Sequence, residues 1–132
     1  MKKLSHQLGW FIAVGATAAA VHWLVVVLLV SGNYLTPLVA NVAGWLVAFG
    51  VSFTGHYQLT FRYQRQGLRQ SISRFFVLSA AGFTINEASY AWLLHQTSLP
   101  YDALLAAILV AVAVLTFIAS RLWAFAATSD PR

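Results

Sequence analysis

Apolar residues dominate four long stretches of this chain, and polar residues gather in the short segments between them. The stretches cover residues 8–30, 37–56, 75–95 and 99–120. Each is long enough to cross a bilayer as a helix, since such a helix needs about 20 mostly apolar residues. The pattern therefore predicts an all-α membrane protein whose residues 1–132 form a single transmembrane domain of four helices.

The composition supports this assignment. With 60% hydrophobic and 8% charged residues, the chain of 132 residues carries more apolar surface than a soluble core of this size can hold. The absence of cysteine excludes disulfides and cysteine metal sites. The first stretch is too long for the apolar region of a secretory signal, so we expect it to be retained.

The basic residues predict the orientation in the membrane. All eight lie at the two termini or in and beside the 62–74 loop: Lys2, Lys3, Arg62, Arg65, Arg69, Arg74, Arg121 and Arg132. Since Lys- and Arg-rich segments stay cytoplasmic, we expect both termini and this loop inside, in a multi-pass protein of the cytoplasmic (inner) membrane. In so apolar a chain, the net charge of +5 indicates contact with anionic lipids and not with nucleic acid.

The two halves of the chain are related by an internal repeat. A shift of 64 residues aligns the first pair of stretches with the second without a gap and superimposes several similar residues, among them Ser52-Phe53 on Thr116-Phe117, Phe11 on Phe75 and Leu35 on Leu99. Each half contains two spans, so the halves are two parallel two-helix repeats. Transporters contain such repeats, but a duplicated inert scaffold produces the same pattern.

Four polar residues interrupt the apolar stretches at one depth. Counting along the helices puts His22 and Glu87 about 20 Å above the inner boundary, with Asn86 and Asn41 near the same level. An unpaired carboxylate at this depth costs at least about 2.5 kcal/mol, so Glu87 is expected to be protonated, paired or beside water. The four residues form either a proton-responsive or substrate-binding group, or interhelical hydrogen bonds that only fix the packing.

Stripes of small residues flank this polar layer and predict which helix faces meet. Small side chains let helices approach closely, whereas bulky ones are left for lipid. The stripes are Gly15, Ala18 and His22 in the first stretch, Ser79, Gly82 and Asn86 in the third, and Asn41, Gly44, Ala48 and Ser52 in the second.

A second polar group is expected at the cytoplasmic end. It comprises His56, Gln58 and Arg62 after the second stretch and Ser120 and Arg121 after the fourth, with Arg65 and Arg69 on one face of a possible interfacial helix. These side chains can bind anionic head groups, or the arginines can simply snorkel and set topology. The sequence has no phosphate-binding glycine loop, no histidine pair at metal-ligand spacing and no second intramembrane carboxylate, so we expect neither enzyme activity nor a cofactor.

Over nearly its whole length, the sequence resembles the GtrA-like family of small four-helix membrane proteins. The resemblance lies in residues 11–15, 38–41, 52–61, 74–77 with Asn86, and 116–125. Family members typically end the second and fourth helices with Asn-Phe-x-x-Asn-Arg-x-aromatic-x-Phe. Here the first Asn is replaced by Ser52 and Thr116 and the second by His56 and Ser120, while Arg121 matches the arginine of the second copy and Tyr57 replaces it in the first.

The resemblance implies translocation of polyprenyl-phosphate-linked sugars, or support of a membrane glycosyltransferase, in cell-surface polysaccharide synthesis. The two polar groups described above supply the candidate substrate-binding residues, which are Arg62, Arg65, Arg121 and His56 at the cytoplasmic end and Glu87, Asn86, His22 and Asn41 along the path. Because one chain is small for a glycolipid head, a homodimer or a complex with the glycosyltransferase is expected. Two alternatives stay open: a proton-coupled multidrug exporter, which usually carries its acid in the first helix, and a non-transporting scaffold for a membrane enzyme.

Overall fold

Four α-helices make up most of the computed structural model, which describes residues 2–60 and 68–119. They are α1 (Lys2–Ser31), α2 (Pro37–Gly55), α3 (Leu68–Gln96) and α4 (Tyr101–Ala119), and a π-helical turn, η1 (His56–Thr60), follows α2 directly. Residues 2–60 and 68–119 contain no strand, which confirms the all-α prediction for this part of the chain.

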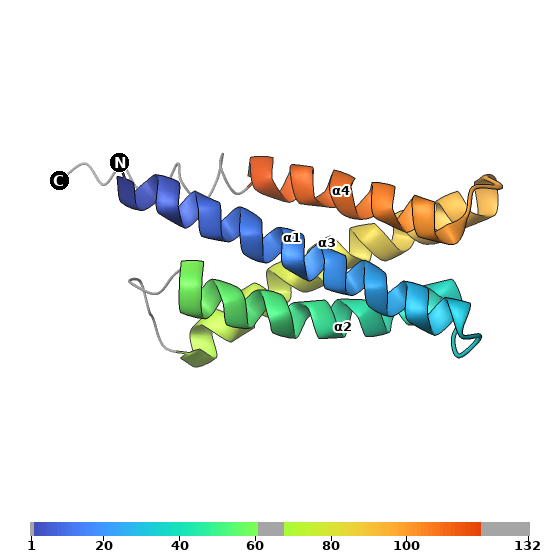
Figure 1. Ribbon diagram of the computed structural model, residues 1–132, viewed down its shortest axis with the longest axis horizontal. Helices are drawn as coiled ribbons and strands as arrows, with labels where there is room; N and C mark the ends of the chain where they lie inside the picture. Colours follow the sequence, from blue (N-terminus) through green and yellow to red (C-terminus); the bar gives the residue numbers. More distant parts are fainter. Residues whose placement is uncertain (1, 61–67, 120–132) are drawn as a thin grey trace.

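Successive helices run in opposite directions (Figure 1). The starts of α1 and α3 and the ends of α2 and α4 lie at one end of the bundle, here called the terminal end. The segments 32–36 and 97–100 lie at the opposite end, here called the turn end. Because the helices run antiparallel, the position of a residue along its helix gives its distance from the terminal end and from the turn end.

Two of the described helical stretches are long and apolar enough to cross a membrane. They are Ser5–Ser31, with 27 residues, and Pro37–Thr60, with 24 residues, while Tyr101–Leu115 is a shorter apolar helix. In α3, Ser79, Asn86 and Glu87 interrupt the apolar sequence. Large apolar side chains such as Leu28, Ile85 and Val110 are more than half exposed on the bundle, as expected for a surface that faces lipid.

Helices α1 and α3 extend further at the terminal end than the apolar stretches predicted. The first begins at Lys2 and the third at Leu68, whereas starts at 8 and 75 were expected. Lys2 and Arg74 are exposed on these extensions. A helix continues through polar sequence at no cost to its backbone hydrogen bonds, so hydropathy alone locates the apolar part and not the helix end.

A Schellman motif ends α1. Asn33 has φ 60°, its N–H donates to Val30 O at 3.0 Å, and the Tyr34 N–H donates to Leu29 O at 3.0 Å. Pro37 then occupies the start of α2, after Thr36 in extended conformation. These bonds satisfy carbonyls at the end of α1 and reverse the chain within a short turn.

Replacing Asn33 by Val is expected to destabilise the protein by about 1–2 kcal/mol, because a β-branched residue is strained at positive φ. Asn33→Gly keeps the turn and is expected to be neutral within about 0.5 kcal/mol. Thermal unfolding in detergent measures both, with Leu99→Val in the other turn as the control. Equal stability of the Val and Gly variants would contradict the assigned turn.

Helices α1 and α2 approach most closely where small residues of α2 face α1. Gly44 and Ala48 are buried there, and a Cβ atom added to Gly44 would lie 2.7 Å from His22 Cδ2 and 2.9 Å from the His22 carbonyl oxygen. In contrast, a Cβ atom on Gly15 or Gly82 meets nothing within 4 Å. The α2 stripe thus lies at a close helix contact, whereas Gly82 of the α3 stripe does not.

All four helices meet in the core near the turn end. The buried apolar residues there are Val26 of α1, Ala40 of α2, Tyr90 of α3, and Leu104, Leu105 and Ile108 of α4. Two side chains also form hydrogen bonds with the backbone at the start of α4. The Tyr90 hydroxyl donates to Tyr101 O and Trp23 Nε1 donates to Asp102 O, each at 3.0 Å. These contacts fix the first turn of α4 against α1 and α3.

The helix bounds follow the internal repeat. An offset of 64 residues separates the first residues of α2 and α4 and also their last residues, and each of these helices has 19 residues. The packing is less symmetric, because Ile108 stands in α4 where α2 has Gly44. A buried isoleucine keeps neighbouring helices further apart than a glycine allows, so the close approach is confined to the first repeat.

Candidate functional site

Three helices contribute polar side chains to one cluster inside the bundle. His22 comes from α1, Asn41 from α2, and Asn86 and Glu87 from α3. These are the four residues whose depth in the sequence predicted a shared layer, and we call them the polar cluster. The structure brings them into one hydrogen-bond network, while their role in binding a substrate stays a prediction.

Asn41 lies at the centre of this network. Its Nδ2 donates to Asn86 Oδ1 at 2.7 Å and to Glu87 Oε2 at 3.3 Å. Its Oδ1 lies 2.6 Å from His22 Nε2. With the amide nitrogen toward two acceptor oxygens, the amide oxygen faces His22, and in this arrangement the His22 tautomer with hydrogen on Nε2 supplies the bond that it accepts. The hydrogen bonds therefore all run in one direction: His22 donates to Asn41, and Asn41 donates to Asn86 and Glu87.

Burial separates Glu87 from the other members of the polar cluster. The exposed fractions are 0% for Asn41, 3% for Asn86 and 5% for His22, whereas Glu87 is half-buried. Among the side chains that the structure describes, no basic group forms a salt bridge with the Glu87 carboxyl. Glu87 is thus the edge of the cluster, and the other three residues form its interior.

The internal repeat places two cluster residues at equivalent positions. His22 and Asn86 are 64 residues apart, the offset that relates α1 to α3. Both bond to Asn41, His22 at its oxygen and Asn86 at its nitrogen. The counterpart of Asn41 in α4 is the buried Leu105. The two halves therefore supply equivalent side chains, His22 and Asn86, to the cluster. Only the first half supplies the amide between them, Asn41.

Trp45 supports the cluster one turn away along α2. Its Nε1 donates to Ser79 Oγ at 2.8 Å, and its ring stacks on Phe83 with centroids 4.6 Å apart. Further rings, Phe49 and Phe76, meet edge to face at 5.5 Å. Sequence reasoning did not select Trp45, although its position four residues after Asn41 puts it on the same helix face. These contacts hold α2 and α3 in the register that the cluster needs.

The predicted cytoplasmic group is described only at His56. Arg62, Arg65 and Arg121 lie outside the described residues. His56 is buried in η1, its Nδ1 lies 2.9 Å from Thr60 Oγ1, and its ring stacks on Phe11 of α1 at 4.9 Å. His56 therefore packs η1 against α1 instead of facing the surroundings, and its expected role in substrate binding stays a prediction.

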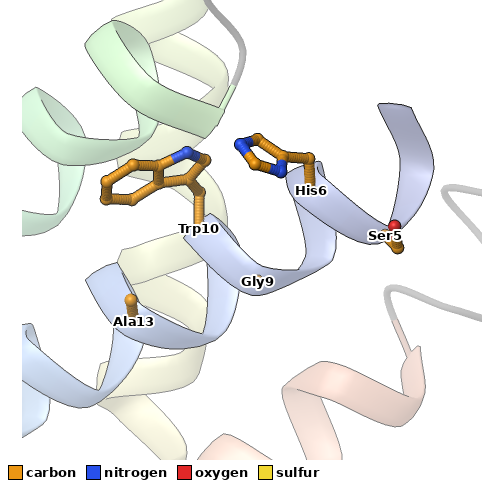
Figure 2. A pocket seen from close by; sticks show the side chains of 5 residues that line it. All are labelled: Ser5, His6, Gly9, Trp10 and Ala13. Carbon is orange, nitrogen blue, oxygen red and sulfur yellow. The ribbon is translucent and has the colours of Figure 1, made fainter. Parts of the chain in front are cut away.

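A shallow pocket lies near the terminal end of α1. Its lining residues are Ser5, His6, Gly9, Trp10 and Ala13. Figure 2 shows the His6 and Trp10 rings projecting from α1 toward the same side. His6 precedes His22 by 16 residues, or about 24 Å along a helix, so this pocket is separate from the polar cluster.

The polar cluster is suited to hydrogen-bond exchange. Within the described residues, no group of three or more His, Asp or Glu side chains could hold a metal ion. The imidazole of His22 and the carboxyl of Glu87 are joined through the Asn41 amide. A carboxyl group at the edge of buried amides can accept hydrogen bonds from a ligand inside an apolar bundle.

Comparison with known proteins identifies the family. The model of the GtrA/DPMS transmembrane domain matches residues 10–125, which covers the greater part of the chain. This confirms the resemblance to the GtrA-like family and, together with the apolar helices, indicates a membrane protein. No curated protein matches the chain, and no solved structure does.

Proposed function

We propose, since this chain belongs to the GtrA/DPMS transmembrane-domain family, that it moves a polyprenyl-phosphate-linked sugar across the cytoplasmic membrane or assists the membrane glycosyltransferase that handles it. The observation that carries this proposal is the polar cluster, a hydrogen-bonded layer among helices with an apolar exterior. A sugar head group must exchange hydrogen bonds to cross hydrocarbon, and the cluster offers such groups at its Glu87 edge.

The topology in this proposal has four membrane spans with both termini inside. The terminal end, with Lys2 and Arg74, then faces the cytoplasm, and the turn end faces outward. Glu87 is 13 residues after Arg74, about 20 Å along α3, which puts it in the outer half of the membrane. Arg62, Arg65 and Arg121 are proposed to bind the phosphate at the cytoplasmic side.

The proposed assembly is a homodimer or a complex with a glycosyltransferase. Apolar side chains of α4 toward the terminal end are exposed by 51–64%: Val110, Val114 and Leu115. This surface provides room for a partner helix or for lipid, and the chain itself is proposed to have no catalytic activity.

The two alternatives rank lower on the same geometry. A proton-coupled drug exporter with its acid in the first helix fits less well, because α1 contributes His22 and the acid, Glu87, comes from α3. A scaffold would account for hydrogen bonds that fix packing, but it does not require a carboxyl group at the edge of the cluster.

Reconstitution into liposomes tests the proposal. The wild type is expected to move a radiolabelled polyprenyl-phosphate hexose between leaflets, and Glu87→Gln combined with Arg121→Ala is expected to slow this movement at least about tenfold. Asp102→Asn, a carboxyl-to-amide change at the start of α4, serves as the matched control and should leave the rate within about twofold.

Three results would count against the proposal. Unchanged movement in the double variant would overturn the residue assignment. Absence of lipid movement, together with lower glycosyltransferase abundance after deletion, would support the scaffold. Drug-dependent proton release by the purified protein would support the exporter.

A further inference from the structure

We infer that Asn41 is a positioning residue that presents the Glu87 carboxyl to the hydroxyl groups of the sugar, with His22 fixing the orientation of the Asn41 amide. This inference rests on the proposed function and assigns separate roles within the polar cluster. Glu87 contacts the ligand, whereas Asn41 and His22 act through Glu87. The phosphate of the same ligand is recognised elsewhere.

The hydrogen-bond inventory of Asn41 is the first argument. A carboxamide nitrogen has two hydrogens, and the structure aims them at Asn86 Oδ1 and Glu87 Oε2, while Oδ1 accepts from His22. With no nitrogen hydrogen left and no exposed surface, Asn41 cannot also bind a ligand without losing a buried bond. Both hydrogens of the Asn41 amide are therefore used to hold its neighbours.

Accessibility identifies the group that remains for a ligand. Glu87 is the half-buried member of the polar cluster, and only its Oε2 accepts a bond from a side chain that the structure describes. The bond from Asn41 holds this oxygen and so directs Oε1 as well, because the two carboxyl oxygens are rigidly linked. A ligand at the edge of the cluster thus meets Oε1 in a set orientation.

The chemistry of that oxygen selects the class of ligand. A carboxyl oxygen accepts a hydrogen bond from a hydroxyl group, and a sugar presents several hydroxyls. The phosphodiester that links the sugar to the polyprenol has acceptor oxygens and negative charge but no hydroxyl to donate, so it lacks the donor that Oε1 needs and binds arginine instead. The polar cluster therefore recognises the hydroxyl-bearing head and not the phosphate that links it to the polyprenol.

His22 determines which way the Asn41 amide points. Rotating the amide by half a turn would place Nδ2 opposite the Nε2–H of His22 and Oδ1 opposite Asn86 Oδ1, which opposes like partners at both ends. A His22 ring with its hydrogen on Nε2 and an Asn41 amide with Nδ2 toward Glu87 thus require each other. His22→Gln retains a donor N–H of similar reach, whereas His22→Leu removes it.

Binding to the purified full-length protein tests this inference with two probes, a short-chain prenyl-phosphate hexose and the same prenyl phosphate without the sugar. The wild type is expected to prefer the sugar-bearing probe. Asn41→Leu, which has no hydrogen to donate, and His22→Leu should each reduce that preference about tenfold. His22→Gln should retain it within about twofold, and binding of the sugar-free probe should stay unchanged in every variant.

The outcomes separate this inference from the proposed function. Equal loss of both probes in Asn41→Leu and His22→Leu, or an unchanged preference, would overturn the positioning role. A wild type that binds both probes equally would overturn sugar recognition by Glu87 but leave translocation standing. Binding of neither probe would overturn both. A shift of the Glu87 carboxyl infrared band in Asn41→Leu, identified by its loss in Glu87→Gln, gives independent support.

Discussion

Gly44→Ala is expected to destabilise the protein by about 1–3 kcal/mol, although alanine usually strengthens a helix. The new Cβ atom would lie 2.7 Å from His22 Cδ2, 2.9 Å from the His22 carbonyl oxygen and 2.9 Å from Val26 Cγ2. Because one of these atoms belongs to the α1 backbone, side-chain rotation cannot relieve the contact, and α1 must move away from α2.

Two glycines in the same bundle provide matched controls. A Cβ atom at Gly50 of α2 or Gly82 of α3 meets nothing within 4 Å. Alanine at either position is expected to be neutral or to stabilise by up to about 1 kcal/mol, through the lower backbone entropy of the unfolded chain. Thermal unfolding in detergent measures all three variants, and a Gly44→Ala protein as stable as these controls would contradict the close contact of α1 and α2.

Asn41→Leu is expected to destabilise the protein by about 2–4 kcal/mol. The change keeps a similar volume but removes three hydrogen bonds of the polar cluster. Interhelical bonds in membrane proteins contribute about 0.6 kcal/mol each, and buried partners left without a bond add a further cost. Asn86 and His22 are nearly inaccessible, so water cannot readily replace the lost amide.

The control for this change removes a hydrogen bond without isolating a buried partner. Thr84 is exposed on α3, and its hydroxyl donates to Ala80 O of the same helix at 2.8 Å. Thr84→Val is expected to change stability by no more than about 0.5 kcal/mol, because the carbonyl keeps its helical bond. If Asn41→Leu is as mild as Thr84→Val in denaturant unfolding, the cluster does not hold the three helices together.

Depth along a helix was predictable because its rise per residue is constant. His22 and Glu87 are far apart in the chain, yet counting from the basic ends of their stretches placed them at one level. Their position in otherwise apolar stretches also indicated that they have partners, since a polar group inside the membrane requires one. The candidate layer followed from these two constraints without knowledge of the helix arrangement.

The partner assignments within the layer were not predictable. The sequence left open whether the four side chains act as a proton-responsive group or only fix the packing, and nothing in it indicated that the Asn41 amide lies between His22 and Glu87. Which side chains touch depends on the rotation of each helix about its axis and on the separation of the axes. The Gly44 contact determines that separation for α1 and α2, and Trp45 against Ser79 and Phe83 determines the rotation of α2 relative to α3.

The sequence by itself determined the helical class, the apolar stretches, the family and the level of the polar residues, because these depend on composition, periodicity and chain length. Only the tertiary structure decided that His56 packs inward against Phe11 and that Asn41 is the centre of the cluster. Those features depend on contacts between helices remote in sequence, where differences of a single methyl group, as at Gly44, set the geometry.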